Sequence, residues 1–199
     1  MASMCRPRGA RPARLCRPKG SLLSSLQDIL SDYRLDSAAR ASEDAYWADK
    51  TVDLDAAIRR ACASTDVYGK RHSHQNRIPA EVMTAAADVL CARTDDIQGA
   101  SDFEALHQVI KQLIGWMPGI GPMQIYDFAT RIGLWLGKSP VLVHLHAGVT
   151  IGAKNLGINV RNRATVRPDE LPAPFCDLPA SEIEDILCIY KEDLLALPR

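Results

Sequence analysis

The sequence predicts an all-α fold. Aromatic residues make up only 6% of the 199 residues and alanine-rich segments are many, a composition that favours helices. Apolar residues recur at helical spacing along almost the whole chain after residue 20. The only credible strand-like run, VLVHL at 141–145, is too short to found a sheet. The length suits a single domain, which we expect over residues 21–199.

The predicted helices can be followed in chain order from their apolar faces. The first face holds Leu22, Leu26, Ile29 and Tyr33. The second follows Asp53, a suitable N-cap, and holds Leu54, Ile58, Ala61 and Cys62. A polar loop is expected at 67–79, before a face of Val82, Ala86, Val89 and Leu90.

Two capping boxes mark helix starts in the second half of the chain, at Ser101–Glu104 and at Ser181–Glu184. The faces that follow them are Phe103, Leu106, Ile110, Leu113 and Ile114 for the first and Ile183, Ile186, Leu187, Tyr190 and Leu194 for the second. Between them we expect a helix through Ile125, Ala129, Ile132 and Leu136, and another at 146–157, interrupted by Gly152. Four prolines predict an extended connector at 166–180.

The charge is unevenly distributed along the chain. Residues 1–20 contain six basic residues and no acidic one, which predicts a disordered basic tail. The remaining residues hold 18 basic and 24 acidic side chains, a net charge of −6. An anionic partner must therefore meet a local basic patch or the tail.

The cysteines and the hydropathy exclude several classes of site. None of the six cysteines forms a C-x-x-C pair, so we expect free thiols in a reducing cytoplasm and no iron–sulfur cluster. No run approaches transmembrane length, which predicts a protein with no membrane partner. Two His-x-His pairs, His72/His74 and His144/His146, would bind zinc only if they met in space. We predict no metal and no cofactor.

A Pro-Gly-Ile-Gly-Pro segment, residues 118–122, interrupts the most apolar helical region. Glycine supplies positive φ for a short turn, and Pro122 suits the first turn of the next helix. The backbone N–H groups of Gly119, Gly121 and Met123 would then lack helical partners and form an anion site. This predicts contact with a DNA backbone by Gly119, Ile120, Gly121, Met123 and Gln124. The alternative is a tight turn that only joins two helices.

Two segments together resemble a known family. LIGWMPGIGPMQIYDFATRIG, at 113–133, resembles the helix-hairpin-helix of the DNA glycosylase superfamily (endonuclease III-like), whose hairpin reads roughly L-P-G-[IV]-G-x-x-x-A. VHLHAGVTIGAKNLG, at 143–157, is similar to that superfamily's V-D-x-H-v-x-R-v-x-x-R-L-G segment. The resemblance covers residues 103–157. It implies a helix-hairpin-helix glycosylase-like helical domain, a monomer that binds double-stranded DNA.

The chain departs from this superfamily at two reactive positions. His144 stands where the family has its catalytic aspartate, and Met123 stands where bifunctional members have a Schiff-base lysine. Met123 excludes lyase chemistry from that position. If the chain is an enzyme, the catalytic candidates are Asp127, His144 and His146, with His144 as a possible general base on water. The alternatives are a solvent-facing or positioning Asp127 and a core or capping His144.

A second candidate DNA contact is the loop GKRHSHQNR, at 69–77. Lys70, Arg71 and Arg77 could contact phosphate, as could Lys154 further along the chain. The candidates for a wedge that fills the place of a flipped base are His74, Gln75 and Asn76. The alternative is a solvated basic loop.

The sequence therefore leaves three functions open. The first is a monofunctional DNA glycosylase that excises a damaged or modified base, for instance from modified phage DNA, and leaves an abasic site. This would serve DNA repair or phage defence. The second is a noncatalytic DNA-binding helix-hairpin-helix module. The third is an all-α interaction protein.

Overall fold

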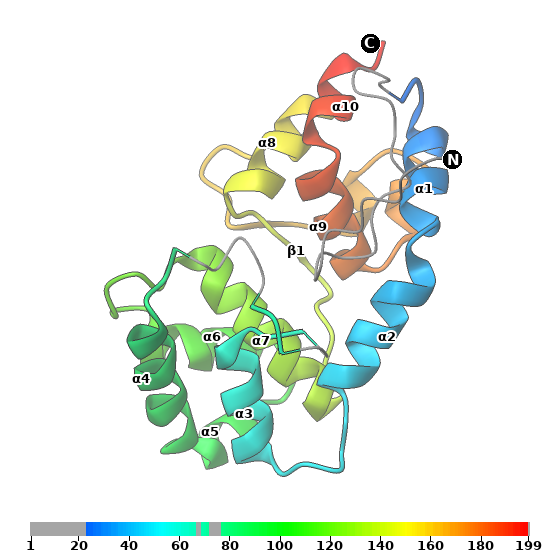
Figure 1. Ribbon diagram of the computed structural model, residues 1–199. Coiled ribbons are helices and arrows are strands. Elements are labelled where there is room, and N and C mark those ends of the chain that lie inside the picture. Colours follow the sequence, from blue (N-terminus) through cyan, green and yellow to red (C-terminus); the bar gives the residue numbers. More distant parts are fainter. Residues whose placement is uncertain (1–22, 67–68, 72–76, 199) are drawn as a thin grey trace.

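The computed structural model describes residues 23–66, 69–71 and 77–198, and over these the chain is mostly helical (Figure 1). The predicted all-α class is confirmed. The α-helices are α1 (Leu26–Arg34), α2 (Ser37–Trp47), α3 (Leu54–Ala63), α4 (Ala80–Cys91), α5 (Thr94–Gly99), α6 (Phe103–Ile114), α7 (Pro122–Leu136), α8 (Ala147–Asn155), α9 (Ala180–Ile189) and α10 (Lys191–Ala196). The basic tail predicted at 1–20 lies outside the described residues.

One small sheet accompanies the helices. Strand β1 (Val143–His144) pairs antiparallel with β2 (Thr165–Val166), and Val143 lies opposite Val166. The connector predicted as extended instead contains two short 3₁₀ turns, η2 (Pro168–Glu170) and η3 (Phe175–Asp177). Only Val143 and His144 of the strand-like run at 141–145 form a strand, and the expectation that this run is too short for a sheet is wrong, because it pairs with Thr165–Val166.

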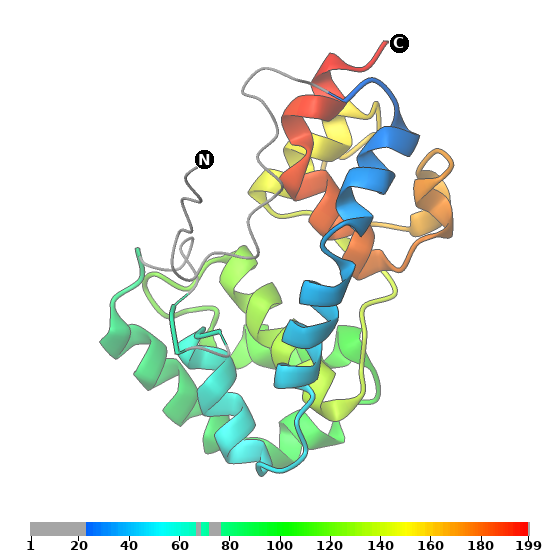
Figure 2. The same ribbon diagram turned by 45° about the vertical axis from the view of Figure 1, so that its right-hand side comes forward.

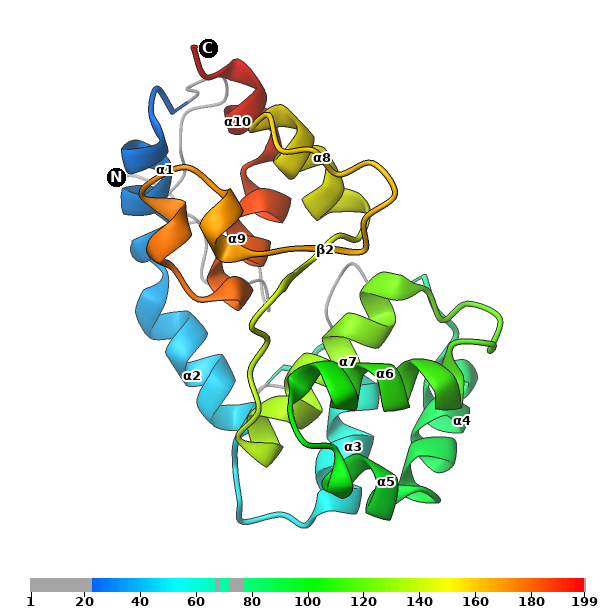
Figure 3. The ribbon, with the colours of Figure 1, turned by 180° about the vertical axis from the view of Figure 1, so that it is seen from behind.

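The described residues pack around two hydrophobic clusters, which define two lobes (Figures 1 and 2). The first lobe consists of α3–α7 and buries side chains such as Ile58, Leu106 and Phe128. The second consists of α1, the sheet, α8, α9 and α10, around Ile29 and Phe175 among others. Helix α2 runs from the second lobe to the first, and the chain after α7 runs back (Figure 3). The sites described below therefore combine distant parts of the sequence.

The helix starts follow the sequence in some places and differ in others. Asp53 caps α3 as predicted, accepting a hydrogen bond from Ala56 N–H at 2.8 Å. Ser101 was expected to cap α6, but Asp102 does so, accepting from Ala105 N–H at 2.9 Å. A charged carboxylate is a stronger acceptor at the positive end of a helix than a hydroxyl.

The second predicted capping box is wrong. Helix α9 begins at Ala180, directly after Pro179, so Ser181 already lies inside the first turn and caps nothing. Glu184 was expected to complete the box, but its side chain is buried and bonds to His146. Tertiary packing thus overrides the local signal at this helix start.

Helix α8 continues through Gly152, so the predicted interruption is wrong. The glycine instead allows α8 and α9 to approach each other closely. A Cβ at this position would overlap the carbonyl oxygen of Leu187 in α9. Backbone atoms cannot move aside as the end of a flexible side chain can. The glycine is therefore required by packing between helices.

Gly152→Ala is expected to lower the free energy of unfolding by about 3 kcal/mol, since the helices must separate to admit the methyl group. Urea denaturation followed by circular dichroism measures this. Gly99→Ala is the matched control, because a Cβ on Gly99 has no heavy atom within 4 Å. Equal stability of the two variants would contradict the close packing of α8 on α9.

Candidate functional site

The turn between α6 and α7, residues 115–121, forms the first part of the candidate site and is called the hairpin turn here. Gly119 has a φ of 91°, the left-handed conformation that favours glycine. Gly121 instead is extended, with a φ of −100°, and caps α7, while Pro122 occupies the first turn as predicted. Only one of the two glycines is thus needed for the backbone conformation.

Several backbone donors of the hairpin turn are available to a ligand. Ile120 N–H donates to Met117 O at 3.1 Å, but the N–H groups of Gly119, Gly121 and Met123 have no backbone acceptor among the described residues. The first turn of α7 contains no acidic residue. A Cβ on Gly121 would meet no heavy atom within 4 Å, so the space beside it is open. These are the features that an anion site at a helix N-terminus needs.

The other predicted DNA contacts are distributed over both lobes. Ile120 and Gln124 are buried, so only their backbone groups could reach a partner. The wedge candidates His74, Gln75 and Asn76 lie outside the described residues. His72 does so too, and the pair His72/His74 that the zinc alternative needs is therefore not described. Of the basic candidates, Lys70 and Arg77 are exposed, Arg71 is half-buried, and Lys154 is exposed on α8 in the second lobe.

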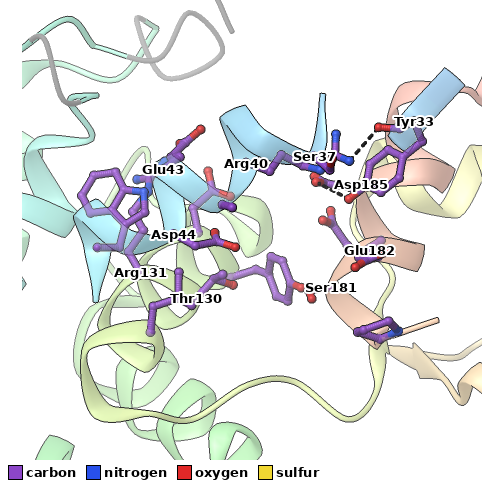
Figure 4. Close-up of a pocket in the computed structure, with 17 residues that line it drawn as sticks. Tyr33, Ser37, Arg40, Glu43, Asp44, Thr130, Arg131, Ser181, Glu182 and Asp185 are labelled. Atoms are coloured by element: carbon purple, nitrogen blue, oxygen red, sulfur yellow. Dashed lines mark hydrogen bonds between the residues drawn. The ribbon is translucent and has the colours of Figure 1, made fainter. Parts of the chain in front are cut away.

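A cavity of about 350 Å³ lies where α2, α7 and α9 meet, and we call it the interlobe pocket (Figure 4). Asp127 lines it, one turn after Met123 on the same face of α7. Acidic side chains dominate the lining: Glu43, Asp44, Asp127, Glu182, Glu184 and Asp185, against Arg40 and Arg131. The pocket is therefore electronegative and disfavours a phosphate group.

Both arginines of the pocket are held by neighbouring elements. Arg40 stacks on the Tyr33 ring and donates to the Tyr33 carbonyl oxygen at 2.6 Å. Arg131 donates to Ser64 Oγ at 2.7 Å and to the Ala61 carbonyl oxygen at 3.1 Å. Burial and the neighbouring carboxylate of Glu43 raise the pKa of Asp44 above its usual range. The carboxylates are thus crowded enough to disfavour one another's charge.

His146 contacts one of the residues that line the pocket. Its ring nitrogen Nε2 forms a short hydrogen bond with the buried carboxylate of Glu184, which lines the pocket. Burial raises the pKa of Glu184, although the hydrogen bond to His146 opposes the rise. His146 itself does not line the pocket. The arrangement makes Glu184 a group that can hold and release a proton at the pocket wall.

His144 lies deeper, between the two lobes. Its Nε2 is 2.9 Å from Glu104 Oε2, and its ring packs among those of Phe103, His107 and Tyr126. Burial lowers the pKa of His144 to about 4, with a further contribution from His146. A neutral imidazole that donates to the Glu104 carboxylate fits this environment. His144 does not line the interlobe pocket, so the structure places it behind Tyr126 as a core histidine.

Of the three predicted catalytic residues, the structure brings only Asp127 to the pocket, while His146 bonds to the lining residue Glu184 without lining the pocket itself. Sequence reasoning missed Tyr126 and Glu184, which line the same pocket. The hydroxyl of Tyr126 is buried beside the side chain of Thr130. In the sequence, Glu184 is only a carboxylate near Ile183 and Leu187 on a predicted helix. Its simpler interpretation there was as the last residue of a capping box.

The buried imidazoles predict a loss of stability in acid. Burial lowers the pKa of His107 to about 4, as it does for His144, from the usual 6.5. The unfolded chain therefore takes up these protons at higher pH than the folded chain, and stability falls as the pH drops from about 6.5 towards 4. We expect a loss of about 1 kcal/mol per histidine between pH 7.5 and 5.5, by urea denaturation.

His107→Gln tests the origin of this pH dependence. The variant should show a smaller loss between the same two pH values than the wild-type chain, because one buried titrating group is gone. A wild-type chain that is equally stable at both pH values would show that these imidazoles are not held neutral.

No helix in the described part of the chain is long and apolar enough to cross a membrane. In the same residues, no group of three or more histidine, cysteine, aspartate or glutamate side chains could hold a metal ion. Comparison with protein-family models, with curated proteins and with solved structures gives no match. The function must therefore be argued from the geometry of this chain.

Proposed function

We propose that the protein binds double-stranded DNA through the hairpin turn and hydrolyses the glycosidic bond of a base held in the interlobe pocket. One observation carries the proposal: a single helix, α7, has unpaired backbone donors at its start and a pocket carboxylate, Asp127, shortly after. The distance along the axis from Gly121 to Asp127 is about 9 Å at the usual helical rise. A phosphate and the base of a nearby nucleotide could occupy the two places together.

The charges assign different parts of the nucleic acid to the two places. The hairpin turn offers N–H donors and a helix N-terminus, which favour a backbone phosphate. The interlobe pocket is rich in carboxylates, which would repel phosphate and are compatible with an uncharged or cationic base. A base would enter by leaving the stack, as in other enzymes that act on bases.

The proposed reaction adds water across the bond between sugar and base. The carboxylate of Asp127 stabilises the oxocarbenium-like sugar, which takes the hydroxyl of the water. Glu184, whose pKa is raised by burial, donates a proton to the departing base, and the proton that the attacking water releases returns Glu184 to its acid form. His146 positions Glu184. Met123 offers no amine, so the product is an abasic site without strand cleavage.

An abasic-site assay tests the proposal. DNA from several sources, including modified phage genomes, is incubated with the protein and then cleaved by heat or alkali. The expected result is cleavage of at least one DNA by the wild-type chain and its loss in Asp127→Asn. If no DNA is cleaved, the catalytic part of the proposal fails.

A specific observation favours a second candidate, the noncatalytic DNA-binding module. His144, which aligns with the family's catalytic aspartate, is bonded to Glu104 and stays outside the pocket. This candidate predicts salt-dependent binding to duplex DNA with no abasic sites on any substrate. Absence of binding at low salt would exclude both DNA-binding candidates and favour an interaction protein.

A further inference from the structure

A second cavity of about 350 Å³ lies between α3 and α4, away from the interlobe pocket, and we call it the Arg71 pocket. Its lining residues are Arg59, Ala63, Arg71, Ala80, Met83, Thr84 and Ala87. The last four share one face of α4, at helical spacing. Among the described residues, no carboxylate lines this cavity.

Two donors of the Arg71 guanidinium have no acceptor in the described part of the chain. Its Nε and Nη2 atoms are buried and have no hydrogen-bond partner in the described structure. These two N–H groups lie on the same edge of the planar guanidinium and point in the same direction. Such an edge matches two oxygens of a single phosphate or carboxylate. A buried N–H group without an acceptor is costly, so the site favours an anionic ligand at this edge of the guanidinium.

The surroundings hold this edge in place and add to its positive character. The backbone of Arg71 pairs with Thr65, and the N–H of the preceding Lys70 donates to Asp66 at 2.9 Å. Helix α4 begins at Ala80 on the pocket wall, so the positive end of its dipole lies there, partly offset by Glu81 in the same turn, which does not line the pocket. The one arginine–carboxylate pair at this wall, Arg59 with Asp88, is exposed. The low-dielectric alanine and methionine side chains strengthen attraction for an anion.

We propose that the Arg71 pocket binds a phosphate oxyanion through the Nε–Nη2 edge of Arg71. The pocket and the hairpin turn lie on opposite faces of the first turn of α4, because Ile78 and Val82 are the residues nearest to Gly119. The phosphate therefore comes either from the DNA backbone, which rests on the proposed function, or from a free phosphate.

The first experiment measures the melting temperature of the full chain in inorganic phosphate against chloride at equal ionic strength. We expect phosphate to stabilise the wild-type chain by several degrees more than Arg71→Gln, with Arg71→Lys between them. Without phosphate, Arg71→Gln should melt slightly above wild type, because two buried donors without an acceptor are removed. Arg93→Gln, an exposed arginine near the end of α4, is the control and should behave as wild type.

The second experiment separates the two sources of phosphate. If the ligand is a DNA backbone phosphate, Arg71→Gln should reduce the slope of log K against log salt for duplex DNA by about 0.9. If it is a free phosphate, the slope stays unchanged and only the melting shift is lost. A chain that binds no DNA but shows the Arg71-dependent shift would sink the proposed function and leave this site standing. A phosphate shift and a salt slope that are both unchanged in Arg71→Gln would overturn the site.

Discussion

Asp127→Asn is expected to lower the rate of abasic-site formation by about 10²–10⁴-fold. The substitution keeps the shape of the side chain and removes the negative charge that would stabilise the sugar cation. Asp127 is only half-buried on a long helix, so the fold should persist. DNA affinity should stay equal or rise slightly, because one carboxylate leaves a pocket with six. The rate is measured on whichever DNA the wild-type chain cleaves.

The control for this prediction is Asp169→Asn. Asp169 is an exposed carboxylate of η2, bonded to Arg167 at 2.9 Å and outside the pocket lining. Its substitution removes the same charge from the chain without touching the site. If Asp127→Asn and Asp169→Asn retained equal rates, Asp127 would not be the catalytic carboxylate. The rate of abasic-site formation by Glu184→Gln then shows whether the proposed proton donor is needed in addition to Asp127.

Gly121→Ala is expected to weaken binding to duplex DNA about 10-fold or more, which corresponds to about 1.4 kcal/mol. Alanine accepts the φ of −100° at this position, and no heavy atom lies within 4 Å of the added Cβ. The folded chain should therefore be unaffected. The methyl group would occupy the open space beside the backbone donors, where a phosphate has to approach. Titration of labelled duplex DNA at several salt concentrations measures the effect.

The salt series gives this prediction a sharper test. Loss of one phosphate contact should reduce the slope of log K against log salt by about 0.9. Gly99→Ala in α5 is the matched control, since it also adds a methyl group in open space. A hairpin turn that only joins two helices would bind DNA equally well with either substitution, or not at all.

Local signals in the sequence were enough to predict much of the architecture. The all-α class, the Asp53 cap and the start of α7 at Pro122 depend on apolar periodicity and on chemistry within one turn of chain. The hairpin turn was predictable for the same reason. Such signals failed at Ser101 and Ser181, where a neighbouring carboxylate and a proline determine the helix start instead.

Only the tertiary structure decided what the functional residues are next to. The pairs His146–Glu184 and His144–Glu104 join residues about forty positions apart. The interlobe pocket is lined by residues of both α2 and α9, which lie far apart in the chain. Periodicity shows which face of a helix is buried, but not which other helix covers it. The sequence by itself determined the helical class, most of the helices and the hairpin turn, although it did not predict α2 or α5 and joined α9 and α10 into one helix. For the same physical reason, packing decided that Asp127 lines a pocket and His144 does not.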